Sequence, residues 1–555
     1  MIESHIAIRL PSEIRVNTLI YMAELLIPTE TEEIDLSQVS HELLAAPPRP
    51  KPLPLARLVF LFATASLLLH FLGRERYGFF RDELYYIACG NHLAFGYVDQ
   101  PPLIAVIARL SSLVFGNTIS GFRFFPALAS AGLVLLTGWM TREFGGGRFA
   151  QTLASFAVLL APIYLAFGSF LSMNAFEPLF WMICACILVR ILKGGDQRLW
   201  LLFGAVAGVG LQNKHTMLMF GFAVIVGMIL AGDRKHLRTQ WFLLGGLLAF
   251  VIFLPNLVWE AQHNWPQIEV VHNARTIKNN PVSLMSFLGE QILFLNPVAL
   301  PIVGAGLAWL LFAKKEQRFR ALGWAFLIVL VVVKVLHGKA YYPMPFYPIL
   351  LAAGGVAFGT LPLDWRKWLR PGFLGLLAIS GLLMLPFGVP VLPLETLLRY
   401  QKLISLENVV QVEHDSAGEL DQLYADMLGW DGMTATIANV YHGLSVTDQA
   451  QCAILAGNYG EAGAIDLLGT KYGLPRAISG HNNYYFWGPQ GHTGEVVILF
   501  GQNAESIKTM FGSVERVAII SDAHAVAAEN HLPVYICRRP KAPLTYIWPS
   551  LRYFE

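Results

Sequence analysis

Three acidic residues lie between the first two apolar segments of the chain, in the stretch RDELYYIACGNHLAFGYVDQPP, residues 81–102. Asp82 and Glu83 are adjacent, and Asp99 precedes two prolines. Adjacent positions on a helix point about 100° apart, so these two acids do not form a carboxylate pair on one face. One of them can face a site while the other binds a neighbouring group or a metal. Ionisable residues beside a membrane are costly and are therefore candidates for function.

A purely structural explanation of these acids stays open at this point. Asp82 and Glu83 would then form an ordinary acidic turn at the membrane border, balanced by arginines of the same loop, Arg74, Arg76 and Arg81. Asp99 would form an extended turn, because proline disfavours helix in the residue before it, or would cap the apolar helix that follows.

Polar residues recur at the borders of later apolar segments. Asn174 and Glu177 are one helical turn apart and share a face, where the glutamate needs a partner, a metal or a substrate. Lys214 and Lys339 could each hold a phosphate as a point charge. The structural alternatives are a helix cap for Asn174 and lysine side chains that extend toward lipid headgroups.

Histidines and cysteines give weaker indications. His263, His272 and His337 could ligate a divalent metal together with outer carboxylates, but their spacing does not support a metal site. Cys452 and Cys537 could form a disulfide if their region faces an oxidising space, and spacing alone leaves this open.

The composition predicts a polytopic α-helical membrane protein. Of 555 residues, 55% are hydrophobic and 14% are charged, whereas soluble domains carry about 25% charged residues. No basic tract or zinc-finger spacing suggests nucleic-acid binding.

Residues 101–115 form either a span or an interfacial helix. About 11 spans are expected, at 57–73, 122–141, 149–168, 172–192, 199–212, 216–232, 241–258, 290–313, 321–336, 343–360 and 372–394.

The distribution of Lys and Arg in the short loops predicts an N-terminus in the cytoplasm. From the second span onward, the outer loops before the C-terminal region hold only Lys214, Arg275, Lys278 and Lys339, and the other loops are basic. The polar clusters described above then all lie on the extracytoplasmic side, which indicates a single site there.

The chain divides into three predicted regions. Residues 1–56 read as a disordered cytoplasmic tail, residues 57–394 as the membrane domain with a first outer loop at 74–121, and residues 395–555 as an extracytoplasmic α/β domain. The stretch CAILAGNYGEAGAIDLLGTKYG predicts strand, turn and helix, and the two stretches EVVILFGQNAESIKTMF and RVAIISDAHAVAAENHLPVYICRRP together predict a strand–helix–strand series. The GxGxxG fingerprint of dinucleotide sites is absent from this domain.

Four stretches together resemble a known family: RDELYY…DQPPL, SMNAFEPLFW, NKHT and GKAYYPMPFYPILLAAGG. They are similar to membrane glycosyltransferases of the C-type fold, most of all to the dolichyl-phosphate-mannose-protein mannosyltransferase-like family (glycosyltransferase family 39 type). The bacterial aminoarabinose transferase that acts on lipid A is a relative of this family. The resemblance covers roughly residues 57–360, and its first motif is the most specific.

The resemblance implies an enzyme that moves a sugar from a polyprenyl-phosphate carrier to a lipid, protein or glycan acceptor on the outer face, generally with inversion. It implies a location in the bacterial inner membrane and assigns Asp82 as the catalytic carboxylate, accompanied by Glu83. Asn174 stands where a second acid is usual. The implied substrate-binding residues are Asp99, Asn174, Glu177, Lys214, His215, Lys339 and Tyr342.

Two other classes compete with this interpretation. A transporter or lipid flippase would explain many spans, but it predicts internal repeats and polar residues near the membrane midplane, which we do not find. A scaffold protein would leave the first outer acids unexplained. An enzyme is expected to gather Asp82, Glu177, Lys214 and Lys339 around one outer cavity.

Overall fold

The computed structural model describes residues 54–278, 283–361, 363–404, 420–502 and 504–555. The predicted N-terminal tail, residues 1–56, lies almost wholly outside these ranges. Every apolar segment predicted as a span coincides with a helix or with a pair of consecutive helices. These are α3 (Arg57–Phe71), α7 (Phe124–Glu143), α8 (Arg148–Leu159) with α9 (Pro162–Ser169), α10 (Met173–Leu192), α11 (Leu199–Asn213), α12 (Met217–Ala231), α14 (Gln240–Gln262), α16 (Leu284–Leu295) with α17 (Leu300–Phe312), α18 (Arg320–Val335), α19 (Tyr347–Gly359) and α20 (Leu363–Gly388).

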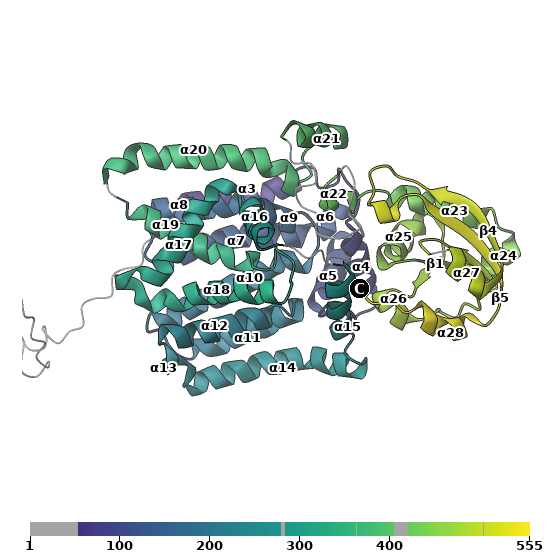
Figure 1. Cartoon of the computed structure of the whole chain (residues 1–555), viewed down its shortest axis with the longest axis horizontal. Coiled ribbons are helices and arrows are strands. Elements are labelled where there is room, and N and C mark those ends of the chain that lie inside the picture. Colours follow the sequence, from purple (N-terminus) through teal and green to yellow (C-terminus); the bar gives the residue numbers. More distant parts are fainter. Residues whose placement is uncertain (1–53, 279–282, 362, 405–419, 503) are drawn as a thin grey trace, which may run out of the picture. The chain divides into compact units, whose positions relative to one another are not determined.

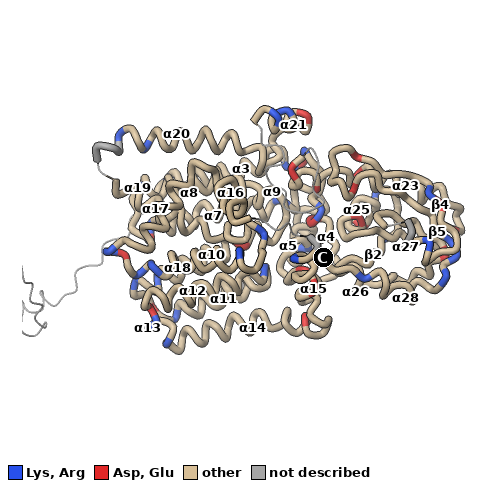
Figure 2. The backbone as a smooth tube through the Cα atoms, in the orientation of Figure 1, with Lys and Arg blue, Asp and Glu red and all other residues tan. Residues whose placement is uncertain are grey.

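The long helices of this set lie side by side (Figure 1), and in Figure 2 they carry charge mainly near their ends. Among the described residues, four helices are long and apolar enough to cross a membrane, or up to six spans if each of two bent helix pairs counts as one. Five further apolar helices are shorter. The predicted helices are therefore confirmed, whereas the count of about 11 crossings and their orientation stay predictions.

The two bent pairs have a local cause. The axes of α8 and α9 differ by 58°, and Pro162 begins α9. The break before α17 turns the chain by 96°, at Asn296 with a φ of 82° followed by Pro297. Proline cannot donate the backbone hydrogen bond that would continue a helix, so each pair breaks there.

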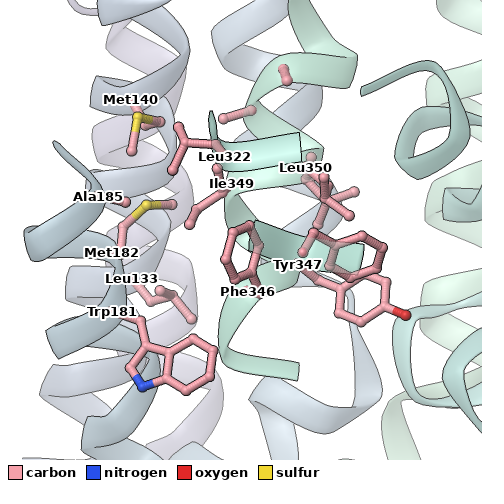
Figure 3. Close-up of a cluster of buried hydrophobic side chains, with 14 of the residues drawn as sticks. Leu133, Met140, Trp181, Met182, Ala185, Leu322, Phe346, Tyr347, Ile349 and Leu350 are labelled. Carbon is pink, nitrogen blue, oxygen red and sulfur yellow. The ribbon is translucent and has the colours of Figure 1, made fainter. Parts of the chain in front are cut away.

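Close helix packing depends on glycine and on large apolar side chains. A Cβ added to Gly204 of α11 would collide with the backbone of Gly245 of α14, so only a small residue permits this approach. Figure 3 shows a cluster of buried side chains from α7, α10, α18 and α19 and from the 3-10 turn before α19, including Trp181, Leu322 and Phe346. This packed bundle supports the segments that carry the candidate site residues.

Residues 74–121, predicted as the first outer loop, contain helices α4 (Arg81–Asn91) and α5 (Leu103–Phe115). Helix α15 (Pro266–Asn273) follows α14, and a 3-10 turn, η4 (Met344–Phe346), precedes α19. Helix α5 has 13 residues and exposes apolar side chains, which suits a membrane border as well as a short span. The choice between these two interpretations of residues 101–115 stays open.

The C-terminal region contains a five-stranded sheet of order β2-β1-β3-β5-β4. Strands β1 (Cys452–Ala456), β2 (Ala477–Ser479) and β3 (Val496–Leu499) are parallel, whereas β5 (Leu532–Pro540) runs antiparallel to β3 and to β4 (Phe511–Ile520). Alternate residues of β1 face α23 (Trp430–His442) and α25 (Tyr459–Leu468) on one side and α27 (Ala504–Met510) on the other. The α/β character of this region is confirmed, and its boundary at residue 395 stays a prediction.

The strand–helix–strand series predicted for the last two stretches is confirmed, because β3, α27 and β4 follow one another in that order. A 3-10 turn at Ala527–Glu529 then joins β4 to its antiparallel neighbour β5, and such a pair needs no crossover helix. Cys452 and Cys537 are free, buried thiols on β1 and β5, the two strands that flank β3. Two strand spacings are about 9.6 Å, and a disulfide needs Cα atoms within about 7 Å. Cys452 and Cys537 are therefore too far apart to form the disulfide that the sequence left open.

Candidate active site

Asp82 and Glu83 lie in the first turn of α4 and follow the different directions that the helix dictates. The Glu83 carboxylate points into the protein and is fully buried. It accepts hydrogen bonds from Nε and Nη2 of Arg123, at 3.1 and 2.9 Å, and from the backbone N–H groups of Phe80 and Leu171, both at 2.8 Å. Four donors therefore fill both oxygens of Glu83, and the expectation that one acid binds a neighbouring group is confirmed.

Arg123, which sequence reasoning missed, completes this buried anchor. It lies directly before α7 and also donates to the carbonyls of Arg74 and Gly78, at 2.6 and 2.8 Å. Its side chain is 1% exposed. A buried arginine needs a carboxylate partner, so an arginine that opens an apolar segment was the available signal. The alternative that arginines of the same loop balance these acids is wrong for Glu83, because Arg123 is its partner, and Arg81 pairs with Asp426 at 3.6 Å.

Asp82 has a more open environment than Glu83. It is half-buried, and its Oδ1 accepts a hydrogen bond from the Tyr459 hydroxyl of α25 at 2.9 Å. In the part of the chain that the structure describes, no hydrogen bond reaches Oδ2. This oxygen can therefore accept a proton without displacing a protein donor.

Asp99 lies near Asp82 and has a similar partner. Its Oδ1 accepts a hydrogen bond from the Tyr85 hydroxyl at 2.9 Å. The capping alternative for Asp99 is wrong, because Pro102 occupies the N-cap position of α5 and no side chain caps that helix. Burial raises the pKa of Tyr86, and the carboxylates of Asp82 and Asp99 raise it further. The negative charges of Asp82 and Asp99 therefore both act on the hydroxyl of Tyr86, which places the two acids in one region.

A second polar cluster forms around Lys214, between α11 and α12. Its Nζ donates to Asn174 Oδ1 at 2.7 Å and to Glu177 Oε2 at 3.0 Å, and Thr216 donates to Glu177 Oε1. The predicted shared face of Asn174 and Glu177 is confirmed. The alternative that Asn174 caps α10 is wrong, because Ser172 accepts the capping hydrogen bond.

Two tyrosines connect the two clusters. Lys214 Nζ lies 4.7 Å from the ring centre of Tyr342 and 5.6 Å from that of Tyr341. Tyr341 is also among the groups that raise the pKa of Tyr86 on α4. Lys339 is half-buried in the same turn, where its carbonyl accepts the N–H of Tyr342 at 3.1 Å. A cavity that joins the clusters stays a prediction.

His215 contacts helix α14, which in turn contacts residues 74–121. Its Nε2 lies 3.0 Å from Oδ1 of Asn256, and the amide of Asn256 donates to the carbonyl of Phe95 at 3.1 Å. Among the described residues, no hydrogen bond links His215 to Asn174 or Glu177, so the substrate-binding role of His215 stays a prediction.

The described residues offer no candidate site for a metal ion. Over the described ranges, no cluster of three or more His, Cys, Asp or Glu residues is placed to hold an ion. One of the suggested ligands, His263, stacks on Trp259 at 4.1 Å and bonds to its carbonyl.

Comparison with known proteins gives consistent results. Residues 99–259 match the sequence model of the dolichyl-phosphate-mannose-protein mannosyltransferase family. Lipid A galacturonosyltransferase RgtD of Rhizobium johnstonii is 24% identical over 340 residues, which are 59% of this chain and 68% of RgtD. The solved structure of ArnT from Cupriavidus metallidurans in the apo state has a TM-score of 0.57 at 15% identity, covering 86% of this chain and 97% of ArnT. ArnT bound to undecaprenyl phosphate gives 0.55 at 16% identity, with the same coverage.

These comparisons confirm the resemblance predicted from the sequence. The fold of the described residues is similar to that of ArnT, and glycosyltransferase is the class of the matching family and of the curated relative. The matched segment begins at Asp99 and includes Asn174, Glu177 and Lys214, whereas Asp82 lies before it. The role of Asp82 therefore depends on the local geometry described above.

Proposed function

We propose that this chain, which carries a mannosyltransferase-family segment within an ArnT-like fold, transfers a sugar from a polyprenyl-phosphate donor to an acceptor on the extracytoplasmic face of a bacterial inner membrane. One structure of the similar protein ArnT holds undecaprenyl phosphate, which favours a donor of this kind. The proposal rests on a half-buried carboxylate, Asp82, and on the polar cluster around Lys214, which Tyr341 connects to helix α4.

Asp82 is the general base in this proposal. It takes the proton of the acceptor hydroxyl on Oδ2, the oxygen without a protein donor, while Tyr459 holds Oδ1. The acceptor oxygen then attacks the anomeric carbon of the sugar, and the bond from that carbon to the phosphate oxygen breaks. Displacement at the opposite face inverts the anomeric centre and releases polyprenyl phosphate.

Lys214 stabilises the leaving phosphate as negative charge develops on it. An ammonium group has three N–H donors. Asn174 and Glu177 accept two of them, and within the described residues no third acceptor binds Nζ. The remaining donor can therefore bind a phosphate oxygen. Lys339 in the adjacent turn adds positive charge to the same region.

The acceptor class is a finer part of the proposal. The curated relative is named for lipid A, so lipid A-type lipids are the first acceptors to test, ahead of proteins and glycans. The transporter or flippase alternative gains no support from the family match or from the relatives.

The test measures release of free polyprenyl phosphate by purified protein in detergent, with a panel of polyprenyl-phosphate sugars and lipid A as acceptor. We expect Asp82→Asn to lower the rate by 100-fold or more, about the low end of the contribution of a positioned general base. The control is Asp431→Asn, since Asp431 forms an exposed pair with Lys471. Equal rates for wild type and Asp82→Asn, with both proteins folded, would exclude Asp82 as the base.

A further inference from the structure

Helix α25 of the C-terminal region presents Tyr459 to the candidate base. β1 ends at Ala456, and Asn458 caps α25 by accepting the N–H groups of Gly460 and Glu461. This cap fixes the first turn of the helix, where Tyr459 lies. The hydroxyl reaches Asp82 across 377 positions of sequence.

The ring of Tyr459 is held from both sides. It stacks on Tyr85 of α4 with centroids 4.6 Å apart and on His481 with centroids 4.8 Å apart. The backbone N–H of Tyr459 also donates to Nδ1 of His481 at 3.3 Å. A ring fixed in this way has little freedom to rotate, so its hydroxyl stays directed at Oδ1 of Asp82.

The second outer acid is connected to the same region through Asn483. The backbone N–H of Asn483 donates to the Tyr85 hydroxyl at 3.3 Å, and that hydroxyl donates to Asp99. Oδ1 of Asn483 accepts the N–H of Val98, the residue before Asp99, at 2.7 Å. Asn483 therefore fixes both the partner of Asp99 and the backbone next to it.

The helices that carry these contacts are in direct contact. A Cβ added to Gly463 of α25 would lie 2.9 Å from both backbone and side-chain atoms of Leu84 on α4. Leu84 immediately follows the two acids, so a shift of α25 would move the first turn of α4. The contact leaves no space in which α25 can slide without displacing Asp82.

We propose that the C-terminal α/β region is a structural part of the transferase site, in which Tyr459 positions Asp82 and Asn483 positions Asp99. The inference depends on the proposed function, because it assigns positioning residues to that reaction. Tyr459 and Asn483 act through the two carboxylates and do not contact the reacting atoms. The region is therefore required for the chemistry itself.

Tyr459→Phe tests the proposal with the full-length protein, because it keeps the stacked ring and removes only the hydroxyl. Without the hydroxyl, the carboxylate of Asp82 can leave the orientation in which it takes the acceptor proton. We expect kcat to fall about tenfold, the loss of one hydrogen bond to a charged group, while the KM for the donor stays within about twofold.

Tyr484→Phe is the matched control. Tyr484 is a buried tyrosine of the same region, and its hydroxyl donates to a carboxylate, Asp466, at 2.9 Å. We expect an unchanged kcat in this variant. An unchanged kcat in Tyr459→Phe, or an equal loss of kcat in both variants, would overturn the proposal. Loss of activity in Asp82→Asn alongside an unchanged Tyr459→Phe would overturn only this inference and leave the proposed function intact.

Asn483→Ala supplies an independent test if Tyr459→Phe does not fold. It removes the acceptor of Val98 N–H, so we expect the KM for the donor to rise about threefold to tenfold with a smaller change in kcat. Gln490→Ala is its control, because Gln490 bonds to the carbonyl of Ala477 in the same region. An unchanged KM in Asn483→Ala would contradict the role assigned to Asn483.

Discussion

Replacing Glu83 by Gln separates anchoring from catalysis at the start of α4. The carboxylate is fully buried and receives four hydrogen bonds, two of them from Arg123. Glutamine keeps the shape, but its NH₂ group would face two donors and the arginine charge would lose its counter-ion. Breaking a buried pair in this way costs about 3–5 kcal/mol. At about 1.4 kcal/mol per factor of ten, the unfolding equilibrium shifts about a hundred-fold to a few thousand-fold.

The assay is unfolding of the purified protein in mixed micelles, followed by tryptophan fluorescence. Glu316→Gln is the control, because its partner Arg318 is 46% exposed and such a pair contributes at most about 1 kcal/mol. We expect the double variant Glu83→Gln/Arg123→Met to lose less stability than the two single variants together.

Activity gives a second and independent readout of Glu83→Gln. Folded molecules of this variant are expected to retain measurable transfer, unlike Asp82→Asn. Stability within about 0.5 kcal/mol of the wild type, the range typical of surface substitutions, would refute the anchoring argument. Full loss of transfer by folded Glu83→Gln protein would return Glu83 to the catalytic role that the family resemblance implies.

Two further predictions concern Lys214 and the C-terminal region. Lys214→Gln is expected to lower kcat about 100-fold in the polyprenyl-phosphate release assay, because it removes the positive charge beside the leaving phosphate. The control Glu177→Gln breaks the same ion pair but keeps the ammonium group. An equal loss of kcat in both variants would contradict this role of Lys214. Burial raises the pKa of Asp466 to about 6, above its usual value of about 3.9. The folded state therefore binds the proton more tightly, so this stabilising contribution is complete below about pH 4 and is lost as pH rises through 6. Asp466→Asn should flatten the dependence of the free energy of unfolding on pH between 4 and 6. An unchanged slope would show that Asp466 does not cause this dependence.

The sequence was sufficient for features that depend on local periodicity. Apolar runs predicted every long helix, and a helical repeat placed Asn174 and Glu177 on one face. The same geometry separated Asp82 from Glu83 before any partner was known. These features follow from residues within one or two turns of each other, so a single sequence contains the information.

The partners of the acids could not be predicted because they come from distant segments. Arg123 lies 40 positions from Glu83, and Tyr459 lies 377 positions from Asp82. In the sequence, Tyr459 belongs to a Gly-rich turn, GNYGEAG, that predicts only the start of a helix. The contact arises from the packing of α25 on α4, which no local pattern encodes. The alternative that Arg81 balances Glu83 failed for the same reason, because the true partner is Arg123.

The division of labour between Asp82 and Glu83 follows from donor counting. Both acids lie in the first turn of a helix, where the backbone dipole favours the anionic form. A carboxylate that already accepts four hydrogen bonds must lose one of them to take up a proton, and Glu83 is enclosed as well. Within the described residues, Asp82 accepts one hydrogen bond, from Tyr459, which can remain in place while the other oxygen is protonated. Proton transfer is therefore less costly at Asp82, even though the two residues are adjacent and chemically alike.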